Sequence, residues 1–237
     1  VLQQYGEDGN LAQYTDRNGD QILYTYDSRG NLTAETWIDA VDGQERQILY
    51  TYDRFSRLVA VDDAETDYAY KYDHRDNLVV ETVTDEDGNS TVFCYTYNPQ
   101  GRVATVTAVV NGTIDFVNEY SYAPDGQVTE IVQHGVEDGN AVTDKRVTFS
   151  YNRTDATVTV RRYEGAEDAE VLVVESTTQY EEMTGALGGS SLAIAGISHV
   201  DAQGNVLASH GYTYNSEGLI DSYTNSTDGN SDYDYDA

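Results

Sequence analysis

The side chains that most often carry chemistry are few in this chain and are poorly spaced for it. Its four histidines, His74, His134, His199 and His210, show no metal-ligand spacing, although His199 and His210 could approach each other across a hairpin. One such pair is too small for a structural zinc site, which uses four protein ligands. Cys94 is the single cysteine, so no internal disulfide can form, and its place in a predicted strand indicates a small apolar side chain.

The sequence also gives no support for a catalytic serine or for a catalytic pair of carboxylates. The stretch 188–192 lacks the G-x-S-x-G pattern of a nucleophile elbow. Acidic pairs are abundant, but a glycosidase needs two carboxylates that face each other across a cleft, and the sequence singles out no such pair. We therefore expect no catalytic residues and no enzymatic activity.

Two acidic stretches invite comparison with calcium sites. Residues 85–89 look like the start of a calcium loop, but the glutamate at the twelfth position and the flanking helices of an EF-hand are missing. Asp228, Asp232, Asp234 and Asp236 form a dense acidic cluster near the end of the chain. We expect no dedicated metal site and no cofactor, with weak Ca²⁺ binding as the one alternative left open.

The overall charge excludes two classes of partner. The 237 residues include 42 acidic and 13 basic side chains, which give a formal net charge of −29. Nucleic acids and anionic membranes need a basic surface, so the sequence predicts neither as a partner. The longest weakly polar stretch, 185–198, is too short and too rich in glycine to span a bilayer, so no membrane insertion is expected.

A tyrosine-rich hairpin is the element around which the chain is organised. In residues 24–36, Asp27 suits the first position of a type I turn, and Gly30 supplies the left-handed residue that closes a three-residue hairpin loop with a bulge. The register predicted from this turn pairs Tyr26 with Leu32, Tyr24 with Ala34 and Thr25 with Thr33.

Side chains alternate across a strand, so this register makes the hairpin amphipathic. It places Tyr24, Tyr26, Leu32 and Ala34 on one face, and Thr25, Thr33 and Glu35 on the other. Tyrosine accounts for 21 residues of the chain. A thin sheet with one aromatic face fits this composition, because each ring can cover roughly 150–250 Å². Counted from Leu32, Trp37 falls on the polar face, where it would be the best candidate to stack on a sugar ring.

The hairpin recurs along the chain with motif tyrosines roughly 20 to 30 residues apart, which is typical of a repeat architecture. The motif positions are Tyr5, Gly9, Leu11, Tyr24, Tyr26, Asp27, Gly30, Leu32, Tyr50, Tyr52, Asp53, Leu58, Tyr70, Tyr72, Asp73, Leu78, Tyr95, Tyr97, Gly101, Val103, Tyr120, Tyr122, Gly126, Val128, Tyr212, Tyr214, Gly218 and Ile220. Where the parent motif has Gly30, Ser56, Asp76 and Asp155 stand instead. We expect either a positive φ at these three positions or a different loop there.

A second set of turns returns the chain for each new hairpin. Asp-Gly and Asn-Gly between alternating strands are strong hairpin signals, and no useful 3.6-residue periodicity is present. The predicted turns lie at 16–20, 42–43, 85–89, 111–112, 137–140, 201–205 and 228–230. Residues 181–191 are the best candidate for an exposed loop.

The repeated Tyr-Asp hairpins resemble the Rhs/YD-repeat family, which includes bacterial Rhs proteins, the shell subunits of insecticidal toxin complexes and animal teneurins. The resemblance covers most of the chain. It implies an all-β fold in which antiparallel hairpins form a solenoid-like ribbon, as part of a β-shell that can enclose a C-terminal toxic or signalling domain. The family's C-terminal core segment, which is linked to self-cleavage, has no match in this sequence.

We interpret residues 1–237 as a single YD-repeat array, a fragment of a longer protein, with degenerate repeats at 152–211. The predicted function is a non-catalytic structural segment of a large bacterial protein that, by the resemblance, is secreted or displayed on the cell surface. The expected partners are further repeats of the same protein and an encapsulated C-terminal domain. Two alternatives stay open: an adhesin that binds cell-surface glycans, and a repeat unit that adds strands end to end into a filament.

Overall fold

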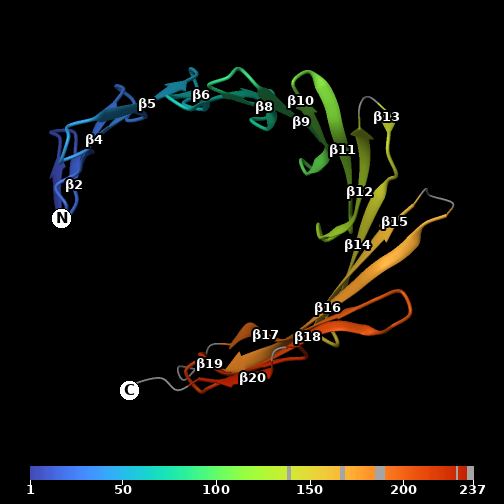
Figure 1. Cartoon of the computed structure of the whole chain (residues 1–237). Helices are drawn as coiled ribbons and strands as arrows, with labels where there is room; N and C mark the ends of the chain where they lie inside the picture. The colour runs from blue at the N-terminus through green and yellow to red at the C-terminus, as the bar shows by residue number, and fades with distance from the viewer. Residues whose placement is uncertain (138–139, 166–168, 185–189, 228, 234–237) are drawn as a thin grey trace. The chain divides into compact units, whose positions relative to one another are not determined.

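All secondary structure in the described part of the chain is β-strand. The computed structural model describes residues 1–137, 140–165, 169–184, 190–227 and 229–233, and these contain 20 strands and no helix (Figure 1). The strands are β1 (Leu2–Tyr5), β2 (Leu11–Thr15), β3 (Gln21–Tyr26), β4 (Leu32–Ile38), β5 (Glu45–Tyr52), β6 (Leu58–Asp63), β7 (Thr66–Tyr72), β8 (Leu78–Asp85), β9 (Ser90–Tyr97), β10 (Val103–Val110), β11 (Thr113–Tyr122), β12 (Val128–Glu137), β13 (Asn140–Ala141), β14 (Lys145–Asn152), β15 (Thr157–Glu164), β16 (Val171–Thr184), β17 (Ser190–Val200), β18 (Val206–Tyr214), β19 (Ile220–Asn225) and β20 (Gly229–Asp232).

The chain divides into two compact units, residues 1–117 and residues 118–237. In the first unit, β1 to β10 pair in chain order, each strand antiparallel to the next. In the second unit, β12 pairs with β14 and the short β13, and β14 to β20 then follow one another as antiparallel neighbours. The all-β, antiparallel hairpin fold predicted from the sequence is thus confirmed.

The sheet in each unit is a single layer. Every strand–strand contact among the described residues joins partners in the hydrogen-bonded ladder, so no strand covers the face of another. Ala34 and Ala108, which are 8% and 1% exposed, are the only buried apolar residues in the described part of the chain. The ladder and the rings that lie on it therefore stabilise the fold, in place of an aliphatic core.

The predicted YD turn is confirmed in detail. Gly30 N–H donates to Asp27 O at 3.0 Å, Asp27 N–H donates to Asn31 O at 2.9 Å, and Gly30 has a φ of 84°. The Asp27 carboxylate accepts hydrogen bonds from the Arg29 and Asn31 N–H groups at 2.8 and 2.9 Å. The Asn31 side-chain amide also donates to it, and this bond is the main reason why the pKa of Asp27 lies below its ordinary value.

The register predicted beyond this turn is wrong by one residue. Tyr26 pairs with Leu32 as expected, but Thr25 pairs with Ala34 and Tyr24 pairs with Glu35, because Thr33 forms a bulge. The Thr25 and Thr33 hydroxyls still lie 3.1 Å apart. The same one-residue shift in register occurs in five other YD hairpins, next to the pair formed by the last tyrosine before the turn. The closing pairs are Tyr5–Leu11, Tyr52–Leu58, Tyr72–Leu78, Tyr97–Val103 and Tyr214–Ile220.

The bulge also moves Trp37 to the other face of the sheet. Because an extra residue in one strand reverses the parity of all later residues, Glu35 and Trp37 share the face of Tyr24, and Ala34 shares the face of Thr25. The pairing of Trp37 with Ile22 places the indole on the tyrosine-bearing face. The predicted position of Trp37 on the polar face, and those of Ala34 and Glu35, are therefore wrong.

Two of the three positions that replace the motif glycine adopt the left-handed conformation. Ser56 has a φ of 62° and Asp76 a φ of 67°. Asp155 instead belongs to a different loop, in which Ala156 carries the positive φ of 50°. Both outcomes lie within the sequence prediction.

We expect Ser56→Gly to raise the free energy of unfolding by about 0.5–1 kcal/mol, because a left-handed non-glycine residue carries strain of roughly 1–2 kcal/mol and glycine costs chain entropy. Urea unfolding followed by circular dichroism would measure the change. Ser56→Ala is the matched control, since it removes the hydroxyl that accepts from the Asn31 amide at 3.1 Å but keeps the strain. A glycine variant no more stable than the alanine variant would contradict the strain at Ser56.

The predicted turns that return the chain for each new hairpin are present wherever the structure describes their residues. Backbone hydrogen bonds close turns between Asp16 and Asp20, Asp39 and Gln44, Asp85 and Asn89, and Asp201 and Asn205. Asn111 and Gly112 both have positive φ, as a two-residue type I′ turn requires. Residues 138–139 and 228, which belong to two other predicted turns, lie outside the described residues, as do Asp234 and Asp236.

The loop predicted at 181–191 is shorter than expected. Strands β16 and β17 stay paired from Glu181–Ala193 to Thr184–Ser190, so the two strands extend into the predicted loop. Residues 185–189 lie outside the described part of the chain.

Candidate functional site

The motif tyrosines of the first unit lie on one face of its sheet. Residues that pair directly across an antiparallel ladder share a face, so the register can be followed from strand to strand. Tyr24 pairs with Glu35, Glu35 with Ile48, and Tyr50 with Val61, which in turn pairs with Tyr68. The tyrosine face defined in this way carries Tyr5, Tyr14, Tyr24, Tyr26, Trp37, Tyr50, Tyr52, Tyr68, Tyr70, Tyr72, Phe93, Tyr95 and Tyr97.

In four hairpins the second tyrosine of the motif bonds to the backbone of an earlier hairpin. The hydroxyl of Tyr97 donates to Leu78 O at 2.6 Å, and Leu78 is the apolar motif residue of the preceding hairpin. Tyr72 donates in the same way to Leu58 O at 2.8 Å. The equivalent bonds elsewhere are Tyr26 to Leu11 O at 3.0 Å and, in the second unit, Tyr214 to Ile194 O at 2.9 Å. These bonds satisfy backbone carbonyls where the bulge interrupts the ladder.

The first tyrosine of the motif meets a glutamate on the same face. The Tyr50 hydroxyl donates to Glu35 Oε1 at 3.3 Å, and the Tyr95 hydroxyl donates to Glu81 Oε2 at 3.1 Å. Partial burial, followed by the charge of Glu35, raises the pKa of Tyr50 to about 12. The same two causes, in the same order, raise the pKa of Tyr24.

Arginines connect neighbouring YD turns along one edge of the first unit. Arg29 Nη1 donates to Arg54 O in the next turn at 2.6 Å. Arg57 forms an ion pair with Asp53 in its own turn at 2.6 Å and with Asp76 in the following turn at 2.7 Å. The Arg57 guanidinium also lies 4.7 Å from the centre of the Tyr72 ring, which is a cation–π contact. Adjacent repeats are therefore held together at their turns as well as along their strands.

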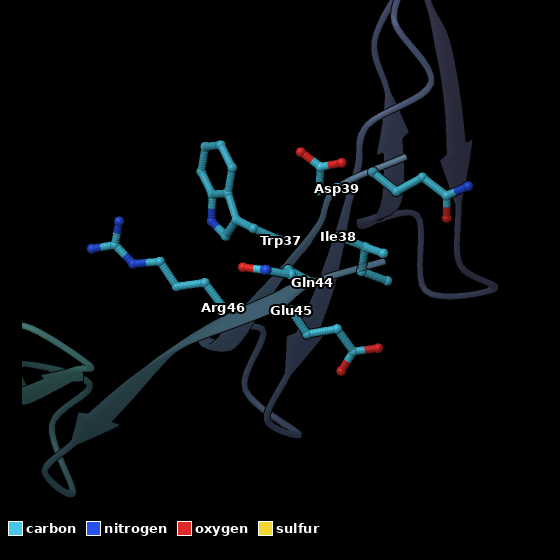
Figure 2. A pocket seen from close by; sticks show the side chains of 7 residues that line it. Trp37, Ile38, Asp39, Gln44, Glu45 and Arg46 are labelled. Carbon is cyan, nitrogen blue, oxygen red and sulfur yellow. The ribbon is translucent and has the colours of Figure 1, made fainter. Parts of the chain in front are cut away.

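Trp37, the residue singled out as a ligand platform, borders a shallow hollow of about 260 Å³. Figure 2 shows the Trp37 ring and the Arg46 guanidinium projecting from neighbouring strands on one side, and the Glu45 carboxylate on the other. The indole is 46% exposed, and its Nε1–H donates to Glu35 at 3.1 Å. The hollow offers an aromatic surface beside polar groups, and carbohydrate binding there stays a prediction.

A larger hollow of about 450 Å³ in the second unit is lined by charged residues. Arg146 pairs with Glu130 at 3.0 Å and with Glu170 at 2.5 Å, and it lies 4.3 Å from the centre of the Tyr163 ring. Two carboxylates thus neutralise the one arginine of this hollow. The arrangement connects β12 and β14 to the residue that precedes β16.

The two histidines predicted to approach each other do so, on β17 and β18. Their ring centroids lie 6.2 Å apart. The hydroxyls of Ser176 and Tyr223 bond to the two rings from β16 and β19, which sequence reasoning missed because these residues are distant in the chain. No group of three or more His, Cys, Asp or Glu side chains able to hold a metal ion occurs among the described residues.

The comparisons with known proteins agree with this arrangement. The family model described as RHS Repeat matches residues 5–36. No curated protein matches the chain. The described residues contain no helix that is long and apolar enough to cross a membrane.

Two solved structures share the fold. A crystal structure of a TcdB2–TccC3–Cdc42 complex has a TM-score of 0.61 at 15% identity, covering 94% of this chain and 13% of that chain. The Tc holotoxin pore of Photorhabdus luminescens, with a TccC3 mutation, has a TM-score of 0.64 at 15% identity, covering 94% of this chain and 12% of that chain. The RHS repeat match and the shared fold confirm the resemblance of this chain to the Rhs/YD-repeat family.

Proposed function

We propose that this chain is a strip of β-sheet wall within a large secreted YD-repeat protein, and that its role is structural. The observation that carries the proposal is the single-layer sheet, in which neighbouring hairpins of the first unit are bonded to one another through tyrosine hydroxyls and turn arginines. Such a sheet is rigid without a core and can be extended by adding repeats, as a wall requires.

The chemistry of the surface supports the same role. The charged hollow of the second unit uses its arginine in internal ion pairs, and the glutamates of the tyrosine face bond to tyrosine hydroxyls. The formal net charge of −29 keeps the exposed surface soluble. We infer that the working partners are further repeats of the same protein and a domain enclosed by the completed shell. The likeness to the Tc holotoxin structure supports this inference at the level of fold.

A wall around a compartment gives its two faces different access to bulk solvent. In a Cys94→Ser background, Trp37→Cys places a thiol on the tyrosine face and Leu49→Cys places one on the opposite face. The two positions lie on neighbouring strands and are similarly exposed in the chain itself, at 46% and 40%. They therefore form a matched pair that differs in the face that carries the thiol.

The test is the rate of labelling in the full-length protein and in the isolated chain. We expect N-ethylmaleimide, which is small, to label both thiols in both preparations. We expect a large polyethylene-glycol maleimide to label both thiols in the isolated chain but only one face in the full-length protein. Equal labelling of both faces by the large reagent in the full-length protein would overturn the wall proposal.

A further inference from the structure

Two histidine rings meet on one face of the second unit. Ile197 pairs with His210 and lies two residues before His199, so the register places both imidazoles on the same side of neighbouring strands β17 and β18. Their ring centroids are 6.2 Å apart and their planes are inclined by 77°. Two imidazoles that share one metal ion at ~2.0–2.1 Å from each nitrogen have centroids roughly 5–6.5 Å apart. The observed separation lies in that range.

Each ring is held through the same nitrogen by a hydroxyl group. His199 Nδ1 lies 2.8 Å from Ser176 Oγ, and His210 Nδ1 lies 2.7 Å from the Tyr223 hydroxyl. Ser176 is only 9% exposed, and the Tyr223 ring stacks on His210 with centroids 5.9 Å apart and an interplanar angle of 16°. When Nδ1–H donates to these oxygens, the lone pair of each imidazole resides on Nε2. This is the arrangement that orients histidines for metal binding.

The remaining nitrogens are free to bind a ligand. No group in the described part of the chain forms a hydrogen bond with Nε2 of His199 or His210. Nδ1 of His199 bonds toward β16 and Nδ1 of His210 bonds toward β19, on the two outer sides of the β17–β18 pair. The opposite ring edges, which carry Nε2, therefore lie on the inner sides of the two rings. Ring packing alone would explain the contact between the imidazoles, but it does not require both Nδ1 atoms to be fixed.

Nearby charges both oppose and favour the binding of a cation at this histidine pair. Arg162 Nη1 lies 3.4 Å from Ser176 Oγ, and its positive charge opposes a cation near His199. The formal net charge of −29 raises the local concentration of cations at the protein surface. Because the pair lacks a third protein ligand, it does not form a closed structural zinc site, and water must complete the coordination of any bound ion.

We propose that His199 and His210 bind one divalent transition-metal ion through Nε2, with Ser176 and Tyr223 as positioning residues. Imidazole ligands suit copper, nickel and zinc, and Cu²⁺ is expected to bind most tightly of these ions. A bound ion joins β17 to β18 directly and, through the hydroxyl partners, braces β16 and β19. It therefore stabilises the folded second unit by an amount that grows with the ratio of free ion concentration to its dissociation constant.

Cu²⁺ alone, titrated into the whole chain, tests the site by calorimetry and electron paramagnetic resonance. We expect one site whose resonance spectrum shows two nitrogen ligands and which disappears in His199→Ala and in His210→Ala. Ser176→Ala and Tyr223→Phe are expected to weaken Cu²⁺ binding by about 10-fold or more, as the loss of groups that orient metal ligands does. His74→Ala removes an exposed imidazole in a YD turn of the first unit, and it is the matched control that should change nothing.

Three results would overturn the proposal: an oxygen-only coordination spectrum in the wild-type chain, unchanged affinity in the His199→Ala/His210→Ala double variant, or loss of the site in His134→Ala. The last result would place the ion beside Asp144, which lies 3.0 Å from His134. Circular dichroism checks that each variant is folded. If a histidine variant unfolds, the nitrogen count in the wild-type spectrum still decides the question.

Discussion

Tyr97→Ala is expected to lower the free energy of unfolding by about 3 kcal/mol, and Tyr97→Phe by about 1 kcal/mol. The alanine variant loses the ring from the tyrosine face and the hydrogen bond to Leu78 O at 2.6 Å. The phenylalanine variant keeps the ring but leaves this partly buried carbonyl without its donor. Urea unfolding followed by far-ultraviolet circular dichroism would measure both changes.

Tyr5→Phe is the matched control for the hydroxyl. Tyr5 is 62% exposed, and its hydroxyl bonds only to the exposed Gln3 side chain of its own strand. We therefore expect no measurable change in the free energy of unfolding. If Tyr97→Phe were as harmless as Tyr5→Phe, the bond between successive repeats would contribute nothing to the wall, and the sheet would depend on its ladder alone.

The turns of this protein could be predicted from its sequence because turn chemistry is local. Asp27 and Gly30 occupy the turn positions that their residue types favour, and the left-handed conformation of Ser56 and Asp76 is one of the two outcomes expected from alignment with Gly30. All the atoms that decide such a turn lie within five residues of one another. The sequence therefore contains the whole explanation, and the hairpin fold follows from its repetition.

The further bulge at Thr33, and its equivalents in the five other hairpins that show the same shift, could not be predicted in the same way. A bulged residue near the right-handed helical conformation can be of almost any type, and Thr33 carries no residue signature for it. One missed residue was enough to place Trp37 on the wrong face, because parity propagates along the whole strand. The hydrogen-bond partners of the tyrosine hydroxyls could not be predicted either. Tyr97 bonds to the backbone carbonyl of Leu78, and a residue of any type supplies such a carbonyl.

Raising the pH above about 10 is expected to destabilise the protein, because the folded state holds several tyrosines in their neutral form. Partial burial raises the pKa of six motif tyrosines, and the pKa of Tyr50 reaches about 12. The six residues are Tyr24, Tyr50, Tyr52, Tyr70, Tyr97 and Tyr214. A group whose pKa is raised by folding contributes its full stabilisation below the unfolded pKa. That contribution is lost as the pH rises through the folded pKa.

For Tyr50, a rise of the pKa from 10.0 to about 12 corresponds to at most ~2.7 kcal/mol, and to about 1–2 kcal/mol once its partial exposure to solvent is considered. We expect the free energy of unfolding to be flat between about pH 6 and 9 and to fall steeply between about pH 10 and 12. Urea unfolding at each pH, combined with the ultraviolet absorbance of phenolate, would show whether ionisation and unfolding coincide. A protein that stays equally stable to pH 12 would contradict this account of the tyrosine face.

Glu35→Gln separates the two causes of the raised pKa, because it removes the carboxylate beside Tyr50 and leaves the ring covered. The Tyr50 hydroxyl should then ionise at lower pH than in the wild type but still above its ordinary value, since burial is the larger cause. Glu81→Gln is the matched control: it makes the same change beside Tyr70 and Tyr95 and should leave Tyr50 unaffected. Equal shifts of the Tyr50 titration in both variants would mean that the general negative charge of the chain, rather than the local glutamate, holds the proton on the wall's tyrosines.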